Sequence, residues 1–171
     1  MWRACDRSGG SAVQVVKVIA IDPGPEASAV VAWDGERIVN KLLAPNADVL
    51  YQLQKWELVA HLVIEQVACY GMPVGEEVFE TVFWTGRFFE SWNVDNVKSP
   101  LGRSRLPRMA VKMHLCHTSR AKDANIRQAL IDRLGKPGTK KQPGITYGIS
   151  KDLWAALALA VTWWDQNAGK P

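Results

Sequence analysis

Three acidic residues, Asp22, Glu65 and Asp152, stand where a folded chain could bring them together. Asp22 ends the apolar run 17–22, Glu65 ends the apolar run 59–65, and Asp152 opens an alanine- and leucine-rich segment. If the two runs are neighbouring strands, both carboxylates emerge at one edge of a sheet, and a helix packed across that edge brings Asp152 to the same point. Converging carboxylates repel one another, so a hard cation such as Mg²⁺, which keeps waters and leaves room for phosphate oxygens, is the natural occupant.

Each of the three acids also has a simpler explanation when it is taken alone. Asp22 precedes Pro-Gly and suits a turn, Glu65 could be an exposed strand end, and Asp152 is favourable at a helix N-terminus through the macrodipole. Their corresponding places in the predicted plan favour a shared site over three separate accidents.

The elements that must position these acids can be predicted from apolar periodicity and turn residues. Asp34-Gly35 indicates a hairpin, and Asn46 can cap the helix that follows it. The predicted strands are 17–22, 27–33, 36–42 and 59–65, with a loop or short edge strand within 93–107. The predicted helices are 46–56, 75–92, 107–114, 123–134 and 151–164. This order describes a mixed sheet with helices on its faces.

The predicted helix 75–92 has more apolar surface than one core contact requires. One stripe holds Val78, Phe79, Val82, Phe83 and Phe89, and a second holds Trp84, Phe88 and Trp92. Either the helix is buried on two sides within the monomer, or the second stripe is a dimer seam. Gly86 in the middle of the helix indicates close approach of another element.

Composition limits the class of protein. A chain of 171 residues suits one domain, and we expect a flexible tail over 1–16 followed by a single domain over 17–171. The three cysteines form no CxxC pair, which argues for a reducing compartment and against structural zinc. No apolar run approaches the roughly 20 residues that cross a bilayer, so we expect a cytoplasmic protein with no membrane partner.

The positive charge is concentrated in one half of the chain. From Lys98 to Lys151 there are 13 Lys or Arg residues against two acids, and the first 97 residues are correspondingly acidic. A basic segment on an acidic body is typical of a protein with a polyanion partner. A merely solvated face is equally compatible with the charge alone.

The motifs around the acids resemble those of RuvC-type Holliday junction resolvases. The matching stretches are Ile21-Asp22-Pro23-Gly24, Val63-Ile64-Glu65-Gln66 and Asp152-Leu-Trp-Ala-Ala-Leu-Ala-Leu-Ala160. The stretches Tyr70–Gly75, Thr85–Phe88 and Arg120–Leu130 resemble the phage branch of that family, and the likeness runs from about Lys17 to Thr162. The motif IDPG alone is weak, but the ordered set is specific.

The resemblance implies an α/β fold of the RNase H-like class, a mixed five-stranded sheet flanked by helices. It also implies a homodimer that makes paired nicks in branched DNA, such as a Holliday junction, with Mg²⁺ or Mn²⁺, in a bacterial cell or a phage-infected host. Asp22, Glu65 and Asp152 match catalytic, metal-binding positions of the family. The family's dimer helix corresponds to 75–92, which favours Trp84, Phe88 and Trp92 as the seam.

Two groups of residues are candidates for contact with DNA. The family has an aromatic wedge where this chain has Ala68; Tyr70 is the nearest ring, and it could equally be a packed core residue. Base stacking on such a ring contributes roughly 1–3 kcal/mol. The candidate phosphate contacts are Arg108, Lys112, Arg120, Lys122, Arg127, Lys140 and Lys141, of which Lys122 stands closest to the expected site.

The sequence departs from the family's pattern at Ala155, where a fourth acid is expected. Glu26, Glu76 or Asp123 could substitute, whereas Asp165 lies about 20 Å along the last helix from Asp152. Two other functions remain open. One is a junction-binding protein with impaired catalysis, and the other is an RNase H-like nuclease that acts on another branched or hybrid substrate.

Overall fold

The computed structural model describes residues 17–55, 60–69, 71–92 and 102–168, and it contains one five-stranded mixed sheet in the order β3-β2-β1-β4-β5. The strands are β1 Val18–Asp22, β2 Ala27–Trp33, β3 Ile38–Pro45, β4 His61–Gln66 and β5 Arg103–Pro107. The helices are α1 Asn46–Lys55, α2 Glu76–Ser91, α3 Arg108–Cys116, α4 Asp123–Leu134 and α5 Leu153–Asn167. The predicted sheet with flanking helices is confirmed.

Hairpin chemistry and register explain the strand order. β2 pairs antiparallel with both β1 and β3, whereas β4 pairs parallel with both β1 and β5. At the β2–β3 turn, Asp34 Oδ1 accepts hydrogen bonds from the backbone N–H of Glu36 and Arg37. Gly35 has a φ of 105°, which favours glycine. The basic segment before α3 ends as an edge strand, β5, one of the two alternatives that the sequence left open.

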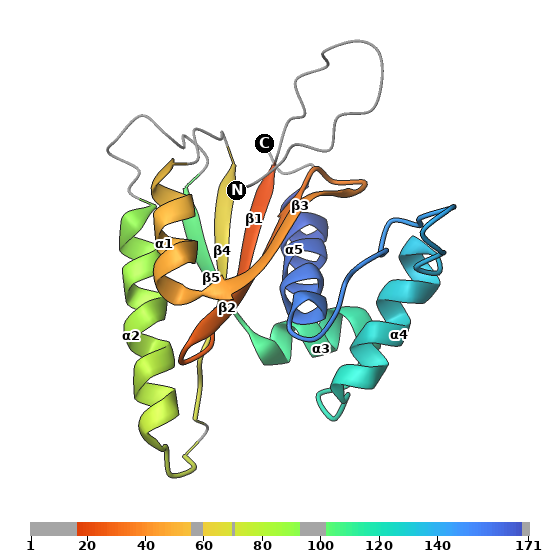
Figure 1. The fold of residues 1–171 in the computed structure, drawn as a ribbon. Coiled ribbons are helices and arrows are strands. Elements are labelled where there is room, and N and C mark those ends of the chain that lie inside the picture. The colour runs from red at the N-terminus through yellow and green to blue at the C-terminus, as the bar shows by residue number, and fades with distance from the viewer. Residues whose placement is uncertain (1–16, 56–59, 70, 93–101, 169–171) are drawn as a thin grey trace.

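The sheet separates two apolar clusters, as strand alternation requires. Val18, Ala20 and Val63 face α5, while Ile19, Ile21 and Ile64 face α1 and α2. Figure 1 shows α1 and α2 on one side of the sheet and α3, α4 and α5 on the other. α5 is the most buried helix, because alanine and leucine line it where it packs against β1 and β2. None of the described helices combines the length and apolarity needed to cross a bilayer.

The prediction for the two stripes of α2 was wrong in its orientation. Phe88 and Trp92 are 0% and 5% exposed and belong to the cluster beneath α1 and α2, so they cannot form an outward dimer seam. Trp84 is half-buried beside them. The outward residues are instead Phe79 and Phe83, at 65% and 57% exposed. The tail predicted over 1–16 lies outside the described residues.

Gly86 also differs from its prediction. A Cβ built on this residue would meet nothing within 4 Å, so no element of this chain that the structure describes makes the close approach that was expected. Gly86 is exposed.

A buried polar network fixes the turn that follows β1. The Ser28 hydroxyl donates to Asn46 Oδ1 over 2.6 Å, and Asn46 Nδ2 donates to the carbonyls of Gly24 and Pro25 over 3.0 and 3.1 Å. Asn46 was predicted to be a helix cap, but its side chain braces this turn. Gly24 is required because a Cβ there would lie 2.5 Å from the carbonyl oxygen of Ala27. The network therefore holds the backbone next to Asp22.

We expect Asn46→Ala to lower the free energy of unfolding by about 2–3 kcal/mol, because it leaves the Ser28 hydroxyl and two carbonyls without their partner. Urea denaturation followed by circular dichroism measures this. Asn40→Ala is the control, since the side chain of Asn40 accepts from the neighbouring Lys41 N–H on β3. Equal losses in the two variants would contradict a special role for Asn46.

Candidate functional site

Asp22 and Glu65 lie side by side at the ends of parallel strands. β1 and β4 pair in register up to Ile21 opposite Ile64, and each acid is the next residue on its strand. Because Ile21 and Ile64 both face α1 and α2, strand alternation turns the two carboxylates to the opposite face, toward α5. The sheet therefore delivers the first two predicted acids to one place.

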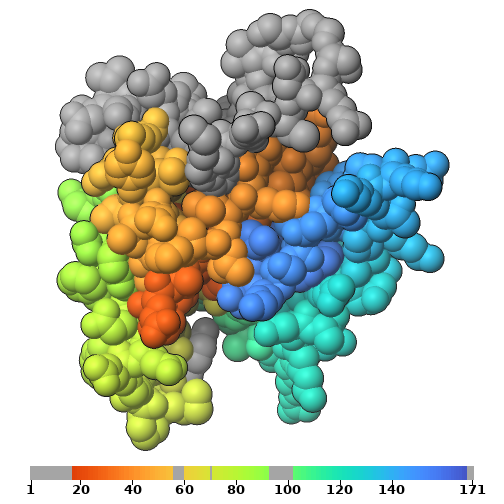
Figure 2. All heavy atoms as spheres, in the orientation of Figure 1, coloured from red at the N-terminus to blue at the C-terminus, as the bar shows by residue number. Residues whose placement is uncertain are grey.

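Asp152 reaches the same region from the start of α5. It is the N-cap residue of this helix and makes no capping hydrogen bond with its side chain, which leaves its carboxylate available. α5 packs against β1 and β4, and its N-terminal end lies at the sheet edge where these strands end. Figure 2 shows a notch at this lower edge, between α2 on one side and α3 and α4 on the other.

The electrostatics of the two strand acids show that several charges converge on them. Burial raises the pKa of Asp22 to about 7, with further increases from the charges of Glu65, Asp152 and Asp123, and Arg108 opposes these effects. Burial also raises the pKa of Glu65; Arg108 and Lys112 lower it, and Asp123 raises it. Asp22 thus resists ionisation until a positive charge is brought close.

Arg108 supplies one such charge within the protein. Its Nη1 lies 2.9 Å from Glu65 Oε2, and its Nη2 lies 2.6 Å from Asp123 Oδ1. Arg108 is the first residue of α3, directly after β5, so the parallel pairing of β4 and β5 places it beside Glu65. A phosphate contact by Arg108 stays a prediction, and the guanidinium is held by two carboxylates.

The donor set fits a hard divalent ion by its chemistry. Asp22, Glu65 and Asp152 offer carboxylate oxygens, which Mg²⁺ prefers. Burial and repulsion between the acids disfavour the ionised form of Asp22 and Glu65 when no cation is bound. In the described part of the chain, no three acid, histidine or cysteine side chains already stand close enough to hold one ion. Metal binding therefore requires these side chains to turn toward one another.

An open groove of about 660 Å³ adjoins Asp152 and carries some of the predicted DNA contacts. Asp123 and Arg127 of α4, together with Lys151, Asp152 and Trp154, contribute to its walls. The Arg127 guanidinium lies 5.0 Å from the centre of the Trp154 ring, which orients it along the groove. Trp154 is buried, and the Arg127 guanidinium lies over its ring.

The other predicted cations are distributed along α3 and α4. Lys112 is one turn along α3 from Arg108, and its charge acts on Glu65. Lys122 directly precedes Asp123 at the start of α4. Arg120 is exposed and lines a separate shallow pocket with Asp132. Lys140 and Lys141 follow the C-terminal end of α4, and that end is about 18 Å from the start of the helix. The structure therefore does not bring these lysines to the carboxylates. Tyr70 lies outside the described residues.

Asp165 belongs to another cluster, as its position along α5 predicted. His114 Nε2 lies 2.7 Å from Asp165 Oδ2, and Arg133 pairs with both oxygens of the same carboxylate. These bonds join α3, α4 and α5 toward their C-terminal ends, away from the carboxylate site. Neither this network nor the Ser28–Asn46 brace could be predicted from the sequence, because their members are distant along the chain.

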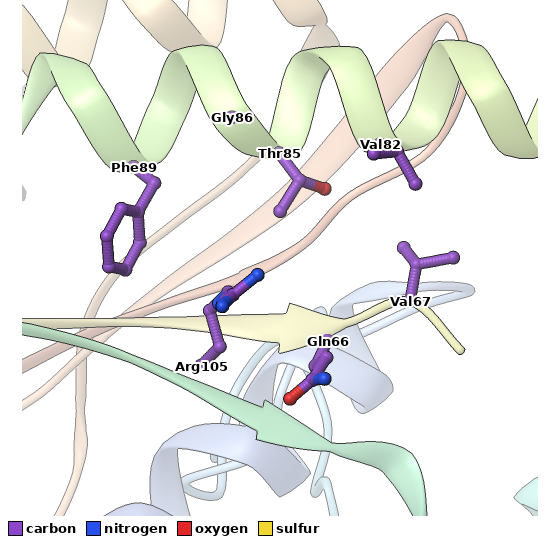
Figure 3. Close-up of a pocket in the computed structure, with 7 residues that line it drawn as sticks. All are labelled: Gln66, Val67, Val82, Thr85, Gly86, Phe89 and Arg105. Carbon is purple, nitrogen blue, oxygen red and sulfur yellow. The ribbon is translucent and has the colours of Figure 1, made fainter.

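A second pocket lies on the opposite face of the sheet from the carboxylates. It has a volume of about 340 Å³, and Figure 3 shows Arg105 reaching from β5 toward α2 while Phe89 and Val82 project from α2 toward the sheet. Gly86 also lines it. Its lining holds no acid, so we do not count it as part of the carboxylate site.

We expect Asp22→Asn to stabilise the metal-free protein at pH 8. An acid whose pKa is raised on folding binds its proton more tightly in the folded state, so stability is lost as pH rises toward that pKa. The difference between a pKa of 3.8 and one of about 7 corresponds to at most about 4 kcal/mol, and a gain on the order of 2 kcal/mol is expected. Denaturation in chelator at pH 8 and at pH 4.5 measures it. The gain should shrink at pH 4.5, and a constant difference at the two pH values would contradict the raised pKa.

Comparison with known proteins agrees with this architecture. No protein-family model matches the sequence, and no curated protein matches it. Among solved structures, Thermus thermophilus RuvC is similar with a TM-score of 0.62 and 18% identity, covering 87% of this chain and 95% of that one. T. thermophilus RuvC in complex with Holliday junction substrate is similar with a TM-score of 0.54 and 20% identity, covering 86% and 92% of the two chains. The chain therefore has the RuvC-like, RNase H-like α/β fold that its motifs predicted.

Proposed function

We propose that this chain is a metal-dependent, structure-selective DNA endonuclease that resolves Holliday junctions or other branched DNA by paired nicks. The observation that carries the proposal is the placement of Asp22 and Glu65 on adjacent parallel strands, facing the helix that Asp152 caps. The similarity to a RuvC structure that contains a Holliday junction substrate supports branched DNA as the partner.

In this proposal Asp22, Glu65 and Asp152 hold Mg²⁺, or Mn²⁺ in its place. The ion would supply Lewis acidity to a phosphate and lower the pKa of a bound water. The remaining work falls to the protein. Arg127 and Lys151 line the groove beside Asp152. Together with Lys122, which directly precedes α4, they would hold the phosphates of the strand to be cut. Trp154 holds the Arg127 guanidinium in place, which lowers the entropy lost on contact.

A homodimer is the second part of the proposal, with a seam different from the one the sequence favoured. Phe79 and Phe83 are 65% and 57% exposed on the outward side of α2. Beside them, Val82, which is 50% exposed, and Gly86 border the pocket between α2 and the sheet. An apolar helix face with an open glycine suits the close packing of a second helix. Two copies would place two carboxylate sites on one junction, as paired nicks require.

A junction-binding protein with impaired catalysis is the second candidate function. Ala155 favours it, because this residue is one turn along α5 from Asp152 and carries no ligand atom. The engagement of Glu65 by Arg108 favours it as well, since a cation already neutralises that carboxylate.

The cleavage test uses a labelled immobile four-way junction beside a linear duplex, each with Mg²⁺, with Mn²⁺ and with chelator. We expect symmetric nicks in the junction only, dependent on metal and reduced at least about 10³-fold in Asp22→Asn. Asp132→Asn is the matched control, because this exposed acid of α4 bonds only to Gln128 among the described side chains. Binding of the junction without cutting in either metal would reject the nuclease and favour the second candidate.

The seam can be tested by replacing Phe79 and Phe83 together with serine. We expect the double variant to shift from dimer to monomer in light scattering and to lose paired nicks before it loses single ones. Tyr51→Ser is the control, because Tyr51 is a comparably exposed aromatic on α1. An unchanged dimer in the double variant would place the seam elsewhere.

A further inference from the structure

Asp123 stands out among the charged residues that the three predicted ligands leave unexplained. It begins α4, and its side chain is 84% exposed. An acid in the first turn of a helix is favourable with the macrodipole alone. That effect does not account for the partner of Asp123, which lies on another helix.

The geometry ties Asp123 directly to the strand acids. One guanidinium, that of Arg108, binds Glu65 Oε2 through Nη1 at 2.9 Å and Asp123 Oδ1 through Nη2 at 2.6 Å. The carboxylates of Glu65 and Asp123 are therefore separated only by the guanidinium that binds both of them. The charge of Asp123 acts on both Asp22 and Glu65. The same residue lines the groove that contains Asp152.

Other acids near the sheet edge lack this connection. Glu26 is exposed on the turn after β1, and Glu76 is exposed at the start of α2; among the described residues neither shares an ion pair with a site residue. Asp165 is engaged by His114 and Arg133. Asp123 is thus the described acid that shares Arg108 with Glu65, raises the pKa of Asp22 and lines the groove of Asp152.

We propose that Asp123 is a fourth carboxylate of the metal site and that Arg108 keeps it beside Glu65 until a divalent ion takes the place of the guanidinium. This inference rests on the proposed function in so far as it assumes a metal at Asp22, Glu65 and Asp152. It assigns the ligand to α4, so metal binding joins α4 to the sheet and to α5. The exposure of Asp123 leaves it free to turn from Arg108 toward the ion.

The test measures Mn²⁺ affinity by titration calorimetry and by the electron paramagnetic resonance signal of free Mn²⁺, in the full chain and without DNA. We expect Asp123→Asn to weaken Mn²⁺ binding about 10-fold or more, while the folded state is retained, because an exposed ion pair contributes about 0–1 kcal/mol. Asp132→Asn, on the same helix, removes the same charge and should leave the affinity unchanged.

A second substitution gives the proposal a rescue test. Position 155 lies one turn along α5 from Asp152 and on the same side of the helix, so an acid introduced there points toward the same ion. We expect Ala155→Asp to restore most of the affinity that Asp123→Asn removes. An Asp123→Asn protein that binds Mn²⁺ like the wild type, or an equal loss in Asp132→Asn, would overturn the proposal.

The outcomes also separate this inference from the proposed function. Mn²⁺ binding that depends on Asp123, in a protein that cuts no junction, would support the fourth ligand and reject the nuclease. Junction cleavage with wild-type Mn²⁺ affinity in Asp123→Asn would support the nuclease and reject the fourth ligand.

Discussion

The parallel pairing of β1 with β4 is the constraint on which the candidate site depends. In-register pairing up to Ile21 and Ile64 makes Asp22 and Glu65 neighbours, and alternation turns both away from α1 and α2. Apolar burial on both faces of the sheet fixes this register, because a slip by one residue would put the acids into the apolar cluster beneath α2. The cost is two partly buried carboxylates with raised pKa values. The surrounding cations, above all Arg108, compensate that repulsion in the metal-free protein.

Much of this arrangement could be predicted because it depends on local pattern. Strand alternation, the Asp34-Gly35 turn and the uninterrupted helix from Asp123 to Leu134 are properties of short segments. The position of Asp22 at a strand end followed from the apolar run before it. The proximity of Asp22 to Glu65 could be predicted on the single assumption that the first and fourth strands pair, which the resemblance also implied.

The failures have a different origin, namely packing between distant segments. α2 carries two apolar stripes, and both have helical spacing, so periodicity could not decide which one faces the sheet. The structure buries Phe88 and Trp92 and leaves Phe79 and Phe83 outside. Likewise, the sequence presents Arg108 as one cation of a basic segment. Only the folded structure shows that its guanidinium forms ion pairs with Glu65 and Asp123. The role of Asn46 was missed because its partners lie about twenty residues earlier, on β2 and in the turn before it.

The length of α4 has a consequence for the shape of any DNA that the protein holds. Asp123 opens this helix at the carboxylate edge, and the loop with Lys140 and Lys141 follows its other end, about 18 Å away. A duplex arm that contacts both would run along the helix axis for about five base pairs, at 3.4 Å for each. In the proposed function, a DNA arm shorter than half a turn would therefore reach the acids without reaching these lysines.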